Sequence, residues 1–252
     1  MTQSSPKAGT ATEREQSLTE KHPSDVQRWL GRETSRTRKA LESASQHFDA
    51  NDVLTVHTLE AVYGQESSFG TRLGTRGSSD PAGHFQFSPD TAKEYGVSVS
   101  KDNDQRFDIH YASSAAARYL KDLDTFFSKD TLLRGSVTIA VKDSSERSKF
   151  VLGAYNGGQT RVADAQHRAE KAGKDPRLWA DVEQFLESKD TSASKADQMR
   201  QYVENALRYQ TEFARTSPAS NRMKRKSSGK GTSRCTEGHW VTINDRPVFI
   251  CD

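Results

Sequence analysis

A carboxylate on an apolar helix face is the first feature of this sequence that could do chemistry. Glu66 follows Val62 by four residues and Tyr63 by three, and Leu59 lies one turn further back. These spacings place all four side chains on one face of a helix, with Glu66 at its carboxyl end. A carboxyl group there is partly desolvated and faces the negative end of the helix dipole, and both effects raise its pKa. A carboxyl group with a raised pKa suits general acid catalysis near neutral pH.

Further short motifs follow Glu66 along the chain. They are Glu66-Ser67-Ser68-Phe69, Gly83-His84-Phe85-Gln86, Ala154-Tyr155-Asn156-Gly157-Gly158 and Gln201-Tyr202-Val203. Their order and spacing resemble the soluble lytic transglycosylase family, which has Glu-Ser at a helix end, a Gly-Leu-Met-Gln-type motif, Ala-Tyr-Asn-x-Gly and a Tyr on a late helix. The segment 115–120 (AAARYL) is also similar to the family's helix between the second and third motifs. The resemblance covers roughly residues 50–215 and is a hypothesis about function.

The resemblance implies a mainly α-helical, lysozyme-like fold with a small loop or hairpin region, and it implies a role for each matched residue. Glu66 matches the catalytic acid/base, and Ser67 matches the Ser that supports the helix end and the site. Gln86 matches the amide that lines the sugar cleft, and Phe85 beside it is a further substrate-binding candidate. No cofactor is implied.

The later motifs complete the candidate substrate site. Tyr155 and Asn156 match the pair that contacts the substrate and the catalytic carboxyl group, and Tyr202 matches the late-helix Tyr. Two departures concern the shape of the cleft. The Leu-Met of the second motif is replaced by His84-Phe85, and the Glu that usually precedes the late Tyr by four residues is Gln198. His84 is either a wall residue or a sugar contact.

The resembled family uses one carboxyl group, whereas most glycosidases use two. The implied substrate is the glycan strand of peptidoglycan, cut between N-acetylmuramic acid and N-acetylglucosamine to leave 1,6-anhydromuramic ends. Asp80 is the best candidate for a second carboxylate, although Asp before Pro commonly starts a turn. The remaining candidates are Asp90, Asp102, Asp104 and Asp108. A muramidase that hydrolyses the same bond and a non-catalytic wall-binding or assembly protein stay open as alternatives.

The helices that must position these residues are visible as apolar periodicity. The spacing predicts helices over residues 35–49, 53–66, 90–94, 112–127, 150–156 and 198–213. Gly157-Gly158 predicts the end of the fifth helix. The segment from Gly70 to Gly83 is rich in helix-breaking residues and predicts a loop or small hairpin.

Composition divides the chain around this helical part. Of 252 residues, 33% are apolar and 28% are charged, which is too polar for one compact core throughout. We therefore expect a disordered polar tail over 1–25, a folded domain over 26–215, a basic linker over 216–234 and a C-terminal segment over 235–252. The net charge of +3 does not by itself indicate nucleic acid binding.

The C-terminal segment predicts a β-hairpin. Trp240–Ile243 and Arg246–Ile250 flank Asn244-Asp245, a pair that tolerates a two-residue turn. Cys235 and Cys251 bracket the hairpin and are a candidate disulfide. The segment weakly resembles C-terminal segments of phage virion proteins. The basic linker and the hairpin are candidate contacts for a protein or an anionic partner, with a solvated linker as the alternative.

The sequence contains no motif typical of metal binding, phosphate binding or a serine nucleophile. The seven His and two Cys residues form no metal-binding motif, and neither a phosphate-binding Gly loop nor a serine nucleophile motif is present. No apolar run is long enough to span a membrane. The first 20 residues lack the apolar stretch of a secretory signal. Because the implied substrate lies in the periplasm or cell wall, we expect delivery in a phage virion or by a specialised secretion machine.

Overall fold

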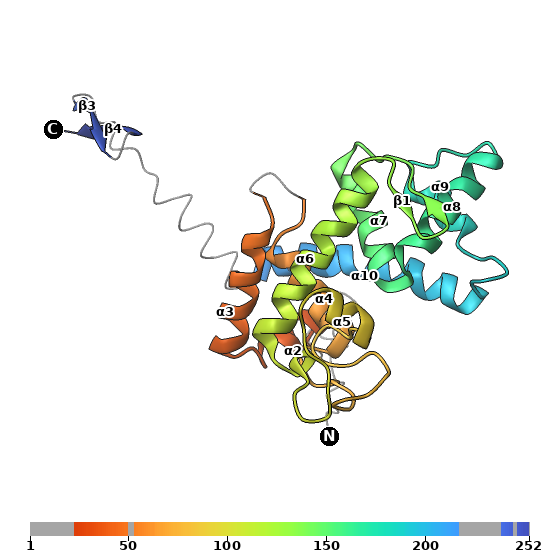
Figure 1. Cartoon of the computed structure of the whole chain (residues 1–252), viewed down its shortest axis with the longest axis horizontal. Helices are drawn as coiled ribbons and strands as arrows, with labels where there is room; N and C mark the ends of the chain where they lie inside the picture. Colours follow the sequence, from red (N-terminus) through yellow and green to blue (C-terminus); the bar gives the residue numbers. More distant parts are fainter. Residues whose placement is uncertain (1–22, 50–52, 217–237, 244–245, 252) are drawn as a thin grey trace, which may run out of the picture. The chain divides into compact units, whose positions relative to one another are not determined.

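The computed structural model describes residues 23–49, 53–216, 238–243 and 246–251. It divides the chain into two compact units, Met1–Arg215 and Thr216–Asp252. The described part of the first unit is mainly helical, as expected for a lysozyme-like domain (Figure 1).

The first half of the helical unit ends in a long central helix. Its elements are α2 (Asp25–Leu30), α3 (Ser35–Ala44), η1 (Ser45–His47), α4 (Val56–Ser67), α5 (Pro89–Glu94), η2 (Gln105–Phe107) and α6 (Ile109–Ser128). The second half begins with a two-stranded ribbon. Its elements are β1 (Leu132–Leu133), β2 (Ser136–Val137), α7 (Ser144–Gly157), α8 (Gln159–Lys171), α9 (Trp179–Val182), η3 (Glu183–Phe185) and α10 (Ala193–Thr216).

Helix α6 forms the centre of the core because one broad face of it is apolar. Alanines 112, 115, 116 and 117 are fully buried and let neighbouring helices approach closely. Leu120, Leu123 and Phe127 continue this face. Helices α3 and α7 pack against α6 (Figure 1). Burial of a Leu or Phe side chain contributes about 1.5–3 kcal/mol, so this face is a main source of stability.

Helix α10 connects the two ends of the domain and carries one side of the site (Figure 1). Near its amino end, Arg200 donates a hydrogen bond to the Glu183 carbonyl of η3 at 2.9 Å. Near its carboxyl end, the Tyr209 hydroxyl donates to Asp25 of α2 at 3.0 Å, and Phe213 stacks on Trp29. These contacts fix the rotation of α10 about its axis, and with it the direction of its other side chains.

The structure confirms the predicted helices but moves their ends. Helix α4 begins at Val56 because the Thr55 side chain accepts a hydrogen bond from the His57 backbone, and α7 begins at Ser144 because Asp143 caps it. The predicted helix over 35–49 ends as an α-helix at Ala44 and continues as a single 3₁₀ turn. The segment from Gly70 to Gly83 is a loop, closed by an isolated bridge between Ala82 and Phe87.

Helices α2, α8 and α9 and the β1–β2 ribbon were not predicted. The ribbon is antiparallel and pairs Leu132 with Val137. In the second unit, β3 (Gly238–Ile243) pairs antiparallel with β4 (Arg246–Cys251), which confirms the C-terminal hairpin. Most of the predicted tail and linker, and Cys235 of the candidate disulfide, lie outside the described residues.

Candidate active site

The candidate catalytic carboxylate lies where α4 ends. Ser68 adopts a left-handed conformation with φ 49°, and Phe69 follows with φ 57°. Two consecutive left-handed residues turn the chain sharply away from the helix axis. Glu66 therefore stands on the last turn of α4 at the edge of the loop that contains Gln86.

Ser67 lies beneath this turn and is fully buried. Its hydroxyl donates to the His84 carbonyl at 2.8 Å and accepts from the Gly70 backbone at 3.1 Å. A hydroxyl that connects two loop segments in this way fixes the loop against the helix end. The resemblance matched Ser67 to a Ser that supports the helix end and the site, and its burial leaves no surface there that a sugar could contact.

Tyr202 of α10 reaches Glu66 from the opposite side. Its hydroxyl donates a hydrogen bond to Glu66 Oε1 at 2.7 Å. Near this contact α10 lies against the end of α7, where a Cβ on Gly157 would clash with the Met199 side chain. Glycine at position 157 therefore leaves room for Met199, which precedes Tyr202 by three residues on α10.

Burial raises the pKa of Glu66 from its ordinary value of 4.5 to about 7. The hydrogen bond from Tyr202 and the positive charge of Lys195 both lower it, but they offset only part of the desolvation. At neutral pH the carboxyl group is therefore divided between its protonated and ionised forms. A group in this state can both give and take a proton.

A cleft of about 520 Å³ surrounds the Glu66 carboxyl group. Its walls are Gln65, Glu66, Pro81, Phe85, Gln86, Phe87, Ser88, Thr91, Tyr119, Tyr155, Asn156, Gln198 and Tyr202. Within the described part of the chain, Glu66 is the only carboxylate in this lining. The structure thus gathers six of the seven predicted site residues around one cavity.

Aromatic rings form one wall of the cleft. Tyr155 stacks on Tyr202 with ring centroids 6.5 Å apart, and Tyr119 lies 5.2 Å from Tyr155. The Tyr155 hydroxyl donates to the Phe85 carbonyl at 3.1 Å. Phe85 is itself only 1% exposed, so its ring supports the wall from behind. A wall of this kind offers apolar ring faces and hydroxyl groups, which together suit a sugar ring.

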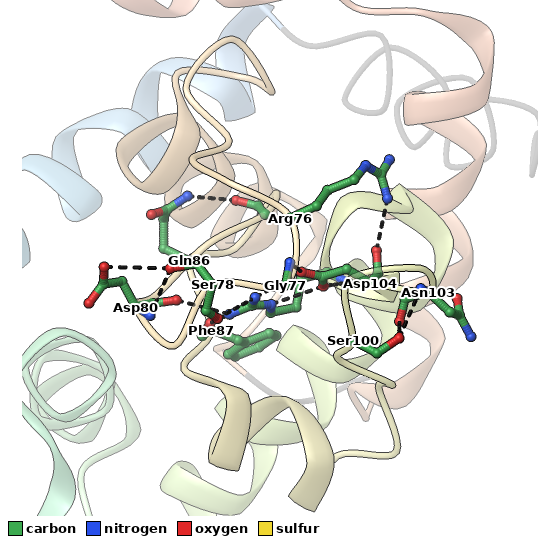
Figure 2. Close-up of polar contacts among 11 residues, drawn as sticks. Arg76, Gly77, Ser78, Asp80, Gln86, Phe87, Ser100, Asn103 and Asp104 are labelled. Carbon is green, nitrogen blue, oxygen red and sulfur yellow. Dashed lines mark hydrogen bonds and ion pairs between the residues drawn. The ribbon is translucent and has the colours of Figure 1, made fainter.

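The opposite wall is the loop that carries Gln86, and it is held by a buried ion pair. Gln86 itself has φ 50°, and its side-chain amide donates to the Gly83 carbonyl at 2.8 Å. Behind it, the fully buried Arg106 donates to both carboxylate oxygens of Asp104 and to the carbonyls of Ser78, Asp80 and Phe87. Figure 2 labels four partners in this network, Ser78, Asp80, Phe87 and Asp104, so the hydrogen bonds join distant parts of the loop.

The candidates for a second carboxylate are not part of the cleft lining. Asp80 is exposed, and its carboxylate accepts a hydrogen bond from Ser78 in its own turn. Asp104 pairs with Arg106, and Asp108 pairs with Arg36 at 2.7 Å. Asp90 and Asp102 are exposed and outside the cleft lining.

His84 faces a different cavity of about 670 Å³, which is lined also by Arg36, Arg76 and Tyr111. Its ring lies 3.1 Å from the Tyr63 hydroxyl, and burial lowers its pKa. The structure therefore places His84 behind the candidate site rather than in the wall of the Glu66 cleft.

Several residues of the site were not found from the sequence. Tyr119 lines the cleft, and Lys195 contacts its rim. Gln198, already noted as a departure from the family pattern, also lies in the lining. Tyr119 lies in the segment 115–120, which the sequence marked only as part of a helix, and Arg106 had no local pattern that marks burial. The described residues contain no group of three His, Cys, Asp or Glu side chains that could hold a metal ion. In the same part of the chain, no helix is long and apolar enough to cross a membrane.

Removal of the Tyr202 hydroxyl tests its influence on Glu66. Tyr202→Phe removes a hydrogen bond that favours the ionised carboxylate, so the pKa of Glu66 should rise above about 7. A hydrogen bond to a charged group contributes about 1.5–3 kcal/mol, which corresponds to about one pH unit or more. If protonated Glu66 starts the reaction, the basic limb of the pH–rate profile shifts upward by that amount. An unshifted limb would contradict this role.

A mainly helical, lysozyme-like domain with one carboxyl group in an aromatic cleft has counterparts among known proteins. The transglycosylase SLT domain family matches residues 45–178, which is more than half of the chain. The chain belongs to this family. Tyr202 lies beyond the matched segment, so its place in the site rests on geometry.

Similar proteins carry one name, membrane-bound lytic murein transglycosylase F. The chain is 28% identical to that of Thiobacillus denitrificans over 153 residues, which are 60% of this chain and 29% of the relative. It is 27% identical to that of Pseudomonas fluorescens over 64% of this chain and 30% of the relative. An 81-residue match to that of Marinobacter nauticus reaches 32% identity and covers 32% of this chain and 14% of the relative. The matches thus span less than a third of these relatives.

Proposed function

We propose that this domain is a peptidoglycan lytic transglycosylase in which Glu66 is the single acid/base. The observation that carries the proposal is the isolated Glu66 carboxyl group, with a pKa of about 7, in a cleft whose described lining contains no second carboxylate. Family membership and the names of the similar proteins support the same activity. The substrate would be the glycan strand of the bacterial cell wall, which sets the site of action in the wall.

The reaction needs one group that first gives and then takes a proton. Protonated Glu66 transfers its proton to the glycosidic oxygen, and the bond from that oxygen to C1 of the muramic sugar breaks. The N-acetyl oxygen stabilises the cation at C1. The 6-hydroxyl oxygen of the same sugar then bonds to C1, and its proton returns to Glu66. Because the attacking hydroxyl is part of the substrate, its effective concentration is high and water is not consumed.

Tyr202 fits the requirements of both steps. Its hydroxyl donates to Glu66 Oε1, so this bond strengthens when the carboxylate becomes charged after the first proton transfer. Oε2 has no such bond to Tyr202 and is the oxygen we assign to proton transfer. Gln86, Tyr155 and Asn156 then serve as substrate contacts along the cleft.

The masses of the released fragments test the proposal against hydrolysis. Purified protein should release muropeptides with 1,6-anhydromuramic ends, which are lighter by one water molecule than hydrolysis products. Mass spectrometry of a digest of purified cell wall distinguishes the two. Reducing muramic ends alone would indicate a muramidase, and binding to the wall without release of fragments would indicate a non-catalytic protein.

A further inference from the structure

Two cationic side chains contact the same end of helix α7 at the edge of the cleft. Lys195 of α10 donates to the Asn156 carbonyl at 3.0 Å, to Asn156 Oδ1 at 3.2 Å and to Gln198 Oε1 at 3.0 Å. Both partners line the cleft. Arg161 of α8 donates to the next carbonyl, that of Gly157, at 2.7 Å. The two cations therefore meet at one edge of the site.

The positive charge at this edge is not neutralised by direct contact with any acidic side chain that the structure describes. Within the described residues, neither Lys195 nor Arg161 forms a salt bridge, and the oxygens that they contact are neutral. By contrast, Arg38, Arg106 and Arg147 each pair with a buried or partly buried carboxylate.

The pKa of Lys195 agrees with an excess of positive charge at this edge of the cleft. Burial lowers the pKa of Lys195, and the charge of Arg161 lowers it further, while Glu66 raises it. Glu66 is only partly ionised at neutral pH, so its compensation is incomplete. A half-buried ammonium group beside a guanidinium group attracts an anion more strongly than an exposed Lys does.

We propose that Lys195 and Arg161 form a subsite for a carboxylate carried by the glycan substrate. The inference rests on the proposed function, because it assigns the anion to the sugar that Glu66 cleaves. Of the two sugars in the peptidoglycan strand, only the muramic sugar has an acidic substituent. Its lactyl group has a free carboxylate in peptide-free strands, and in complete strands the carboxylates lie on the attached peptide.

A purely structural role is the competing explanation. Cations near the carboxyl end of a helix interact favourably with its dipole, by about 0.3–1 kcal/mol. Lys195 and Arg161 contact the last carbonyls of α7 and can act in this way. Such a role predicts a lower melting temperature after substitution but no dependence of binding on the charge of the substrate.

The experiment measures binding in the Glu66→Gln background, so that no strand is cleaved. Three probes are compared by calorimetry: peptide-free strands with the free lactyl carboxylate, the same strands with that carboxyl group converted to an amide, and strands with peptides. Lys195→Met should weaken binding of the first probe about tenfold, the size of one charge-assisted hydrogen bond, and leave the amide probe unchanged. Lys195→Arg should retain the preference. Lys189→Met, an exposed lysine outside the cleft lining, is the matched control.

Each outcome decides the proposal. Loss of affinity confined to the third probe would assign the carboxylate to the peptide. Equal loss on the neutral and charged probes, or no loss on any of them, would overturn the subsite. Failure of the wild-type protein to cleave any strand, together with charge-dependent binding, would overturn the proposed function and leave the subsite standing.

Discussion

Glu66→Gln lowers the rate of glycan cleavage by about 10³-fold or more, because a single side chain is asked to act first as acid and then as base. The amide has nearly the shape of the carboxyl group but cannot exchange a proton. Release of muropeptides from purified cell wall measures the effect. Glu204→Gln, at an exposed position of α10, is the matched control and should retain wild-type activity.

The same substitution should not unfold the domain, and the sign of the pKa shift says why. The pKa of Glu66 is about 7 in the folded state against 4.5 as its ordinary value. Between these two values the folded state holds the proton more tightly, so the contribution of Glu66 to stability falls as the pH rises through this window. The neutral amide of the Glu66→Gln variant avoids this loss, so the variant should melt no lower than the wild type at pH 8. Retained activity in a folded Glu66→Gln protein would remove Glu66 from the mechanism.

The sequence alone predicted the part of the site that lies on regular helices. Glu66 follows an apolar helical stripe, which marks a desolvated carboxyl group, whereas Tyr155 and Tyr202 were assigned through the resemblance of short motifs on helices to the transglycosylase family. The structure adds how they meet. The contact between Tyr202 and Glu66 joins α10 to the end of α4, two segments that are distant in the sequence.

The parts that were missed depend on tertiary contacts or on weak local signals. Helix α8 buries mainly alanines, such as Ala163 and Ala165, whose small side chains give a faint apolar stripe. Helix α2 falls almost wholly within the predicted folded domain but has only six residues, too few to show apolar periodicity, and its place is fixed by Trp29, which docks on Gly64 and Tyr209. Nothing in the sequence around Lys195 indicated a place at the cleft, because that place depends on its contacts with Asn156 and Gln198 in the folded chain.

Arg106 supports the loop that forms one wall of the cleft, although nothing in the sequence near it predicted this role. Burial raises the pKa of Asp104, but hydrogen bonds from Arg106 and from the Gly77 backbone outweigh it and hold the pKa below 3.8. The ion pair therefore stabilises the fold above that pH, and the contribution is lost as the pH falls through the lowered value. The hydrogen bond from Arg106 to the Phe87 carbonyl couples this stabilisation to the cleft wall.

Arg106→Met is expected to destabilise the domain by about 3–5 kcal/mol at neutral pH, because it leaves Asp104 buried without its partner. For a domain of this size the melting temperature should fall by roughly 10 °C, as measured by calorimetry. Arg36→Met, which breaks an exposed pair with Asp108, should cost at most about 1 kcal/mol and serves as the control.

Two further measurements separate the buried charge from the shape of the loop. Adding Asp104→Asn to Arg106→Met removes the unpaired carboxylate and should recover part of the lost stability, because the penalty for burying that charge disappears. It cannot restore the hydrogen bonds to the carbonyls of Ser78, Asp80 and Phe87. Cleavage by the double variant, assayed well below its melting temperature, should therefore stay below wild type, because the wall that carries Gln86 has lost its support. Full activity in that variant would show that the loop keeps its position without Arg106.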